Sequence, residues 1–168
     1  NLTKINIDYT TNSGMNWINI ASSVPSPNGS FSWTIPYPPS PTYKVRVSDI
    51  YSSLSSESDT TFEVTSALSI MSPSGGENWP ISSQRYITWT SNYINNLKIE
   101  YTTNNGANWL LIDSNIPASS GQYLWTVPNL PASICKIRLT SMDNNTVTSV
   151  CPSFSIIPVL DITSPLGG

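Results

Sequence analysis

One long motif occurs twice in the sequence, and its two copies lie 92 residues apart. Residues 4–17 read Lys-Ile-Asn-Ile-Asp-Tyr-Thr-Thr-Asn-Ser-Gly-Met-Asn-Trp, and residues 96–109 read Asn-Leu-Lys-Ile-Glu-Tyr-Thr-Thr-Asn-Asn-Gly-Ala-Asn-Trp. The same offset relates Trp33 to Trp125 and continues without a gap into the C-terminal Gly-Gly pair. A fixed period of this length indicates a repeated domain, because most domains contain about 50–250 residues.

The period divides the 168 residues into one complete unit and two partial ones. Residues 68–159 form the complete unit. Residues 1–67 form a unit that lacks counterparts of its first two strands, and residues 160–168 correspond to the opening strand of a third unit. We therefore expect the chain to be a window on a longer tandem array.

Each unit has the residue pattern of β-strands. Apolar and polar side chains alternate at 4–10, 31–35 and 43–47 in the first unit, as they do at the equivalent positions of the second. Turn residues separate these segments at the spacing of a β-sandwich. The pattern predicts an all-β fold of tandem immunoglobulin-like antiparallel β-sandwiches. In the complete unit, strands are expected at 68–72, 84–90, 96–103, 108–113, 121–127, 134–141 and 153–157.

Composition excludes several classes of function. Charged residues make up 10% of the chain and the net charge is −3, so the clustered lysines and arginines of a nucleic-acid-binding protein are missing. The chain contains no histidine, which excludes Ser-His-Asp and Cys-His nucleophiles and imidazole metal sites. No apolar run approaches the ~20 residues of a membrane span. With no paired carboxylates in one unit and no glycine-rich phosphate loop, we expect neither an enzyme nor a cofactor.

The order of several short motifs in the complete unit resembles that of a known family, the KNH-like immunoglobulin-fold domain of fungal cell-wall-synthesis proteins and Ser/Thr-rich GPI-anchored proteins. Similar domains occur as tandem repeats in large secreted prokaryotic proteins. The resemblance implies a β-sandwich on an extracellular or cell-surface protein and no catalytic residues. One departure is Pro80-Ile81, where the family has a glycine-containing turn. The motifs are Ser72-Pro73-Ser74-Gly75-Gly76-Glu77-Asn78-Trp79, Ile87-Thr88-Trp89, Lys98-Ile99-Glu100-Tyr101, Asn105-Gly106-Ala107-Asn108-Trp109, Trp125-Thr126-Val127-Pro128 and Lys136-Ile137-Arg138.

A shorter resemblance covers the two Thr-Thr-Asn-x-Gly-x-Asn-Trp segments at 10–17 and 102–109, which are similar to the Asp-box hairpin with asparagine in place of aspartate. In sialidase-like propellers that box is a structural turn. A propeller fragment is therefore an alternative fold, but the 92-residue period disfavours it because propeller blades repeat every ~40–50 residues.

The tryptophans are interpreted as scaffold residues. Trp17 is repeated as Trp109 and Trp33 as Trp125, whereas Trp89 falls in the stretch that occurs once. Repetition favours packing in the core or against turns over ligand binding. The predicted core of the complete unit consists of Trp89, Ile99, Tyr101, Trp125, Ile137, Leu139 and Phe154. Two loop aromatics that differ between the units, Tyr37 and Tyr51, remain candidates for ligand contacts.

The carboxylates are predicted to form exposed ion pairs across neighbouring strands. Asp8 is expected to pair with Arg46 or Lys44, and the equivalent Glu100 with Arg138 or Lys136. Exposed pairs of this kind contribute ~0.2–1 kcal/mol to stability.

Cys135 and Cys151 are present in one unit and both absent from the other. This paired gain predicts a disulfide between them, which fits an oxidising compartment; the alternative is two free thiols. Three N-x-S/T sequons occur, and of these Asn28 and Asn144 are candidate glycosylation sites, with Asn1 as the third.

The sequence leaves two functions open. The first is a non-catalytic structural or adhesive repeat of an extracellular or cell-surface protein, a spacer or fibre subunit whose partners are further copies of the repeat. The second is a carbohydrate-binding accessory domain of a secreted enzyme, with glycans as partners. Because 1–67 lacks two strands, we also expect this unit to be completed by upstream chain in a covalent array or, as the alternative, by the 160–165 strand of a neighbouring subunit.

Overall fold

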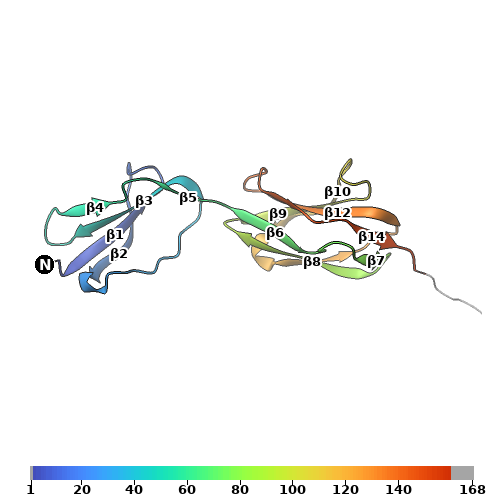
Figure 1. The fold of residues 1–168 in the computed structure, drawn as a ribbon, viewed down its shortest axis with the longest axis horizontal. Coiled ribbons are helices and arrows are strands. Elements are labelled where there is room, and N and C mark those ends of the chain that lie inside the picture. The colour runs from blue at the N-terminus through green and yellow to red at the C-terminus, as the bar shows by residue number, and fades with distance from the viewer. Residues whose placement is uncertain (1, 160–168) are drawn as a thin grey trace, which may run out of the picture. The chain divides into compact units, whose positions relative to one another are not determined.

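The computed structural model describes residues 2–159 and confirms an all-β fold with antiparallel sheets. The chain divides into two compact units, Asn1–Thr65 and Ser66–Gly168, so the boundary lies two residues before the expected one. Figure 1 shows both units as strands joined by turns. The expected opening strand of a third unit, 160–168, lies outside the described residues.

The first unit contains one sheet, in the order β2-β1-β3-β4, with β5 paired to β3. Its strands are β1 (Lys4–Thr10), β2 (Ile18–Pro25), β3 (Ser40–Asp49), β4 (Ser55–Glu57) and β5 (Phe62–Val64). A short 3-10 turn, η1 (Ser26–Asn28), follows β2.

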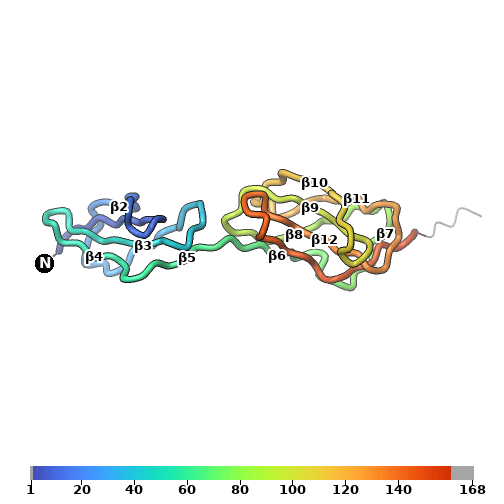
Figure 2. The backbone as a smooth tube through the Cα atoms, turned by 90° about the horizontal axis from the view of Figure 1, so that it is seen from above, coloured from blue at the N-terminus to red at the C-terminus, as the bar shows by residue number. Residues whose placement is uncertain are grey.

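The second unit is a sandwich of two sheets. One has the order β10-β9-β12-β14-β7, with β13 paired to β12, and the other has the order β11-β8-β6. Figure 1 shows the layers nearly edge-on, with β12 in one and β8 in the other, and Figure 2 traces the chain between them. The elements are β6 (Ala67–Ser72), β7 (Asn78–Pro80), β8 (Gln84–Asn92), β9 (Asn96–Thr102), β10 (Leu110–Pro117), η2 (Ala118–Ser120), β11 (Gln122–Thr126), β12 (Ala132–Ser141), β13 (Thr148–Val150) and β14 (Phe154–Ile157).

Every strand predicted for the complete unit is present, within a few residues. The two that the pattern missed, β7 and β13, are three residues long, too short for alternation to be visible. Strand β7 also ends at a proline, and it pairs with β14 in parallel. It lies at the edge of its sheet, the position where a strand proline is tolerated.

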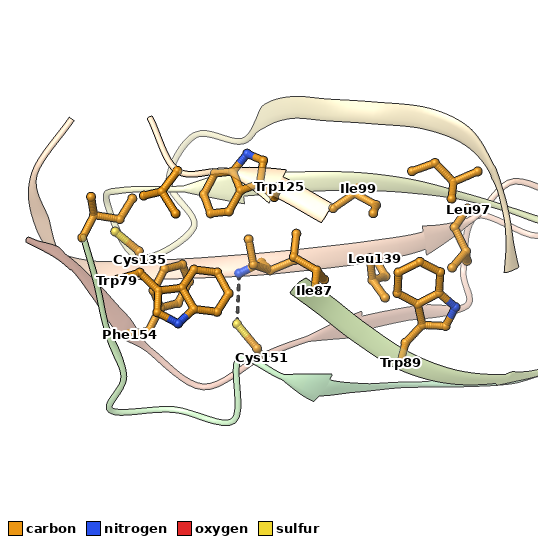
Figure 3. Packing of buried hydrophobic residues seen from close by; sticks show 14 of the residues in the cluster. Trp79, Ile87, Trp89, Leu97, Ile99, Trp125, Cys135, Leu139, Cys151 and Phe154 are labelled. Carbon is orange, nitrogen blue, oxygen red and sulfur yellow. Dashed lines mark hydrogen bonds between the residues drawn. The ribbon is translucent and has the colours of Figure 1, made fainter. Parts of the chain in front are cut away.

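The core of the second unit lies between its two sheets (Figure 3). Six of the seven predicted core residues are buried, and Tyr101 is half-buried with its ring 5.2 Å from that of Trp125. The core also contains Trp79, which the prediction omitted and which packs on Phe154 at a ring distance of 4.7 Å. In Figure 3, Trp79 and Phe154 fill one end of the core and Trp89 fills the other.

The strand expected over 31–35 in the first unit does not form, and that prediction is wrong. Figure 1 shows the connection from η1 to β3 without an arrow. In the second unit the equivalent strand, β11, pairs only with β8. Among the described residues of the first unit there is no counterpart of β8, the strand with which β11 pairs in the second unit.

Candidate functional site

The repeated Thr-Thr-Asn-x-Gly-x-Asn-Trp segment forms the same turn in both units. In the second, Thr102 Oγ1 accepts hydrogen bonds from the amides of Asn104 (3.2 Å) and Gly106 (3.1 Å). Asn104 Oδ1 accepts from the amide of Asn108 at 3.0 Å. Thr102 is fully buried, so its hydroxyl replaces water for these amides. The turn is thus held by internal hydrogen bonds, as expected for a structural element.

Beside each turn an arginine stacks on a tryptophan and forms an ion pair with a carboxylate. The Arg138 guanidinium lies 4.2 Å from the centre of the Trp109 ring, within cation–π range, and donates to Glu100 Oε2 at 2.7 Å. The first unit has the same arrangement, with Arg46 lying 4.4 Å from the Trp17 ring centre and 3.0 Å from Asp8 Oδ2.

The electrostatics of Glu100 differ from the prediction in two respects. Of the two predicted partners, Arg138 binds it and Lys136 does not, and a second cation that was not predicted, Lys98, lies 3.1 Å from Glu100 Oε1. Glu100 is also only 8% exposed, whereas the prediction placed it at the surface. Burial raises the pKa of Glu100, but hydrogen bonds and charges from Arg138 and Lys98 outweigh burial and hold the pKa below its ordinary value. An ionised carboxylate clamped between two cations stabilises the fold and is a poor proton donor.

The tryptophans divide into two groups. Trp79, Trp89 and Trp125 are buried in the core of the second unit. Trp89 also donates from Nε1 to the carbonyl of Ala118 at 2.8 Å, which satisfies its polar atom inside the core. The other three, Trp17, Trp33 and Trp109, are half-buried.

The predicted disulfide between Cys135 and Cys151 is wrong, since both are free, buried thiols. The amide of Cys151 donates to the Ile137 carbonyl at 3.0 Å, so Cys151 lies opposite Ile137, whereas Cys135 pairs with Phe154. Diagonal positions of this kind place Cα atoms about 7–8 Å apart, and disulfides need less than about 7 Å. In Figure 3 the Cys151 sulfur accepts a hydrogen bond from the Ile137 amide, at 3.0 Å.

Both thiols are held in the neutral form. Burial raises the pKa of Cys151 to about 11 and raises that of Cys135 as well. The thiolate is the nucleophilic form of cysteine, so these groups act as small apolar core residues.

The remaining candidate residues lie at the surface. Tyr37 is 49% exposed and Tyr51 is 71% exposed, each in a loop of the first unit. Asn28 and Asn144 are exposed, and Asn144 Oδ1 accepts from the Thr146 hydroxyl of its own sequon at 2.8 Å. Asn1 lies outside the described residues.

Neither a metal centre nor a membrane helix is found within residues 2–159. No cluster of three or more histidine, cysteine, aspartate or glutamate side chains occurs there. No helix in that range is long and apolar enough to cross a bilayer.

The first unit has an apolar groove of about 340 Å³. The groove lies on the face of the sheet formed by β1, β2 and β3 and extends to the segment that follows η1. The sequence predicts the missing strands but not a shaped cavity beside them. The groove is lined by Ile5, Ile7, Ile20, Val24, Pro25, Ser26, Gly29, Ser30, Phe31, Trp33, Val45 and Val47.

Comparison of the sequence with models of known protein families and with curated proteins finds no match.

Proposed function

We propose that the chain is a non-catalytic structural repeat of an extracellular or cell-surface protein, serving as a spacer or as a fibre subunit. The observation that carries this proposal is the use made of its tryptophans. Those in the core hold two sheets together, and those beside the turns support an arginine–carboxylate pair. Five of the six tryptophans, all except Trp33, therefore serve the stability of their own unit.

The resemblance to KNH-like domains supports an extracellular location. The low content of charged residues and the abundance of short antiparallel strands fit a module that links other parts of a surface protein. Further copies of the repeat are the partners that this function requires.

Carbohydrate binding is the alternative, and the exposed Tyr37 and Tyr51 favour it. A glycan-binding face usually presents several aromatic rings in a row. On the outer face of the β11-β8-β6 sheet, the exposed large side chains are Leu124, Tyr86 and Met71, of which one is aromatic. This composition favours the spacer over the binding module.

Affinity electrophoresis of the full chain in gels containing soluble polysaccharides tests the proposal. A spacer is expected to migrate at the same rate with and without each polysaccharide. Saturable retardation that is lost in Tyr37→Ala or Tyr51→Ala, and kept in the control Tyr86→Ala, would establish the binding module instead.

Location is tested separately, by brief protease treatment of intact cells that produce the protein. Release of peptides from this chain before any cytoplasmic marker is expected. Protection of the chain until the cells are lysed would contradict the extracellular assignment.

A further inference from the structure

The lining of the groove in the first unit corresponds, position by position, to residues of the core and its rim in the second. Ile7, Val45 and Val47 are equivalent to Ile99, Ile137 and Leu139, which are fully buried. In the first unit Val45 and Val47 are only half-buried, and Phe31 is 46% exposed. The groove is therefore the exposed half of a core.

The second unit shows what covers this surface. Strand β8 lies across it, with Ile87 and Trp89 pointing into the core. The amide of Trp89 donates to the Gly121 carbonyl at 3.0 Å, and its indole donates to the Ala118 carbonyl at 2.8 Å. Strand β8 thus contributes apolar side chains, strand pairing and a specific indole hydrogen bond.

The first unit retains the receptor for these contacts. Gly29 closes η1 with φ 68° and ψ −8°, and the equivalent Gly121 closes η2 with φ 65° and ψ −4°. Ser26 and Gly29 occupy the positions of Ala118 and Gly121, whose carbonyls accept from Trp89. Their backbone geometry is therefore already formed where an incoming indole and amide would bind.

We propose that this groove binds an extended polypeptide segment of the β8 type, one that pairs with residues 30–34 and inserts a tryptophan against Ser26. The inference deepens the proposed function, because it names the partner of one face of the repeat. The occupant is the β8-type strand of a repeat of the same kind, a segment with the residue pattern of Gln84–Asn92.

The apolar lining and the strand order favour this occupant over the alternatives. The lining is dominated by isoleucine, valine and aromatic side chains, which match apolar residues better than a sugar. The segment at 160–165 is equivalent to β6, and in the second unit β6 pairs with β8 rather than with β11 or the sheet of β12. That segment alone would leave 30–34 without a partner.

The test adds a synthetic peptide of residues 82–94 to the full chain and follows backbone amides by NMR. The amides at 30–34 are expected to exchange with solvent at least tenfold more slowly when the peptide is bound, and the Trp33 indole signal is expected to shift. The equivalent amides at 122–126 serve as a control, because their hydrogen exchange would change if the peptide replaced β8 in the second unit.

Matched peptides test the tryptophan contact without altering the protein. A Trp89→Ala peptide is expected to bind at least tenfold more weakly, whereas a Thr90→Ala peptide, altered at an exposed position, is expected to bind as the parent does. In the protein, Val24→Asp in the groove is expected to abolish binding, and Ile18→Asp, on the same strand outside the groove, to preserve it.

Three results would overturn the inference. The first is unchanged exchange at 30–34 with saturating peptide, and the second is equal affinity for the Trp89→Ala peptide. The third is protection of 30–34 that rises with protein concentration alone and disappears when 160–168 is deleted, which would make the occupant the end of a second copy. Polysaccharide binding would contradict the proposed function while leaving the peptide result unaffected.

Discussion

Tyr43 and Cys135 occupy equivalent positions, and the difference in their volume reflects what surrounds each. Cys135 is buried in a core that also contains the large Trp79. Tyr43 is equally buried, stacks on Phe62 at a ring distance of 5.6 Å, and donates from its hydroxyl to the Pro36 carbonyl at 3.0 Å. The larger residue fills space in the unit that has no counterpart of Trp79 among its described residues.

The buried thiols are expected to resist alkylation while the protein is folded. At pH 8 the Cys151 thiol, with its pKa raised to about 11, is almost entirely protonated, and both groups are covered by core residues. Mass spectrometry after treatment with iodoacetamide should find no modification in buffer and two modified cysteines in denaturant. A single intact disulfide under non-reducing conditions would contradict the structure.

The lowered pKa of Glu100 makes the free energy of unfolding depend on pH. Because its pKa is lowered in the folded protein, the unfolded chain binds the proton more readily, and the stabilisation is complete only above the ordinary pKa of 4.5. It is lost as the pH falls through the folded value.

Glu100→Gln should therefore reduce the loss of stability in acid, measured by urea denaturation from pH 7 to pH 3. The dependence should not vanish, because hydrogen bonds from Ser74 and Gly75 outweigh the effect of burial and also lower the pKa of Glu77. An unchanged pH profile in Glu100→Gln would show that Glu100 is not coupled to folding.

At the scale of elements, the sequence predicts strands well where alternation is long and a partner strand is present. The spacing of apolar residues predicts β1, β3, β9 and β12, and the expected immunoglobulin-like order predicts the pairs β1–β3 and β9–β12 that the structure shows. Apolar and polar residues alternate as regularly at 31–35 as at 123–127, yet only the second segment forms a strand. The difference comes from β8, and a local pattern contains no information about whether a partner is available.

The candidate sites show the same limit. The pairs of Asp8 with Arg46 and Glu100 with Arg138 could be predicted, because they are cross-strand neighbours. The burial of Glu100 could not be predicted, because it depends on how Arg138 stacks on Trp109, a residue outside both paired strands, while it binds Glu100. The missing disulfide has a similar origin, since the register of the strands places Phe154 opposite Cys135 and Cys151 opposite Ile137, two residues further along β12.

Truncating two equivalent tryptophans shows how much stability the β8 strand adds, because Trp125 lies beside that strand and Trp33 has no counterpart of it among the described residues. Trp125→Ala removes a side chain from a closed core and is expected to destabilise the second unit by about 3–5 kcal/mol. Trp33→Ala, at the edge of the open groove, should cost clearly less because its side chain already contacts solvent. Urea denaturation followed by circular dichroism measures both losses. Equal losses would mean that the two positions are equally enclosed.

At the scale of the molecule, the two units share a repeated sequence pattern but differ in how fully their cores are enclosed. The second unit encloses its core between two sheets, whereas the first presents the equivalent surface as a groove on a single sheet. Each Å² of apolar surface that is buried stabilises the folded state by about 25 cal/mol, and apolar surface that stays exposed makes no such contribution. The first unit is therefore expected to open at a lower free energy than the second.

Native-state hydrogen exchange of the full chain compares the matched segments most directly. We predict near-intrinsic exchange of the amides at 30–34, and exchange at 122–126 that is slower by a factor of about 1,000 or more, as for amides of a core strand. Strands β1 and β3 should also open at lower urea concentrations than β9 and β12. Equal protection of the two segments in the isolated protein would contradict an open groove, because it would mean that the first unit closes its own core.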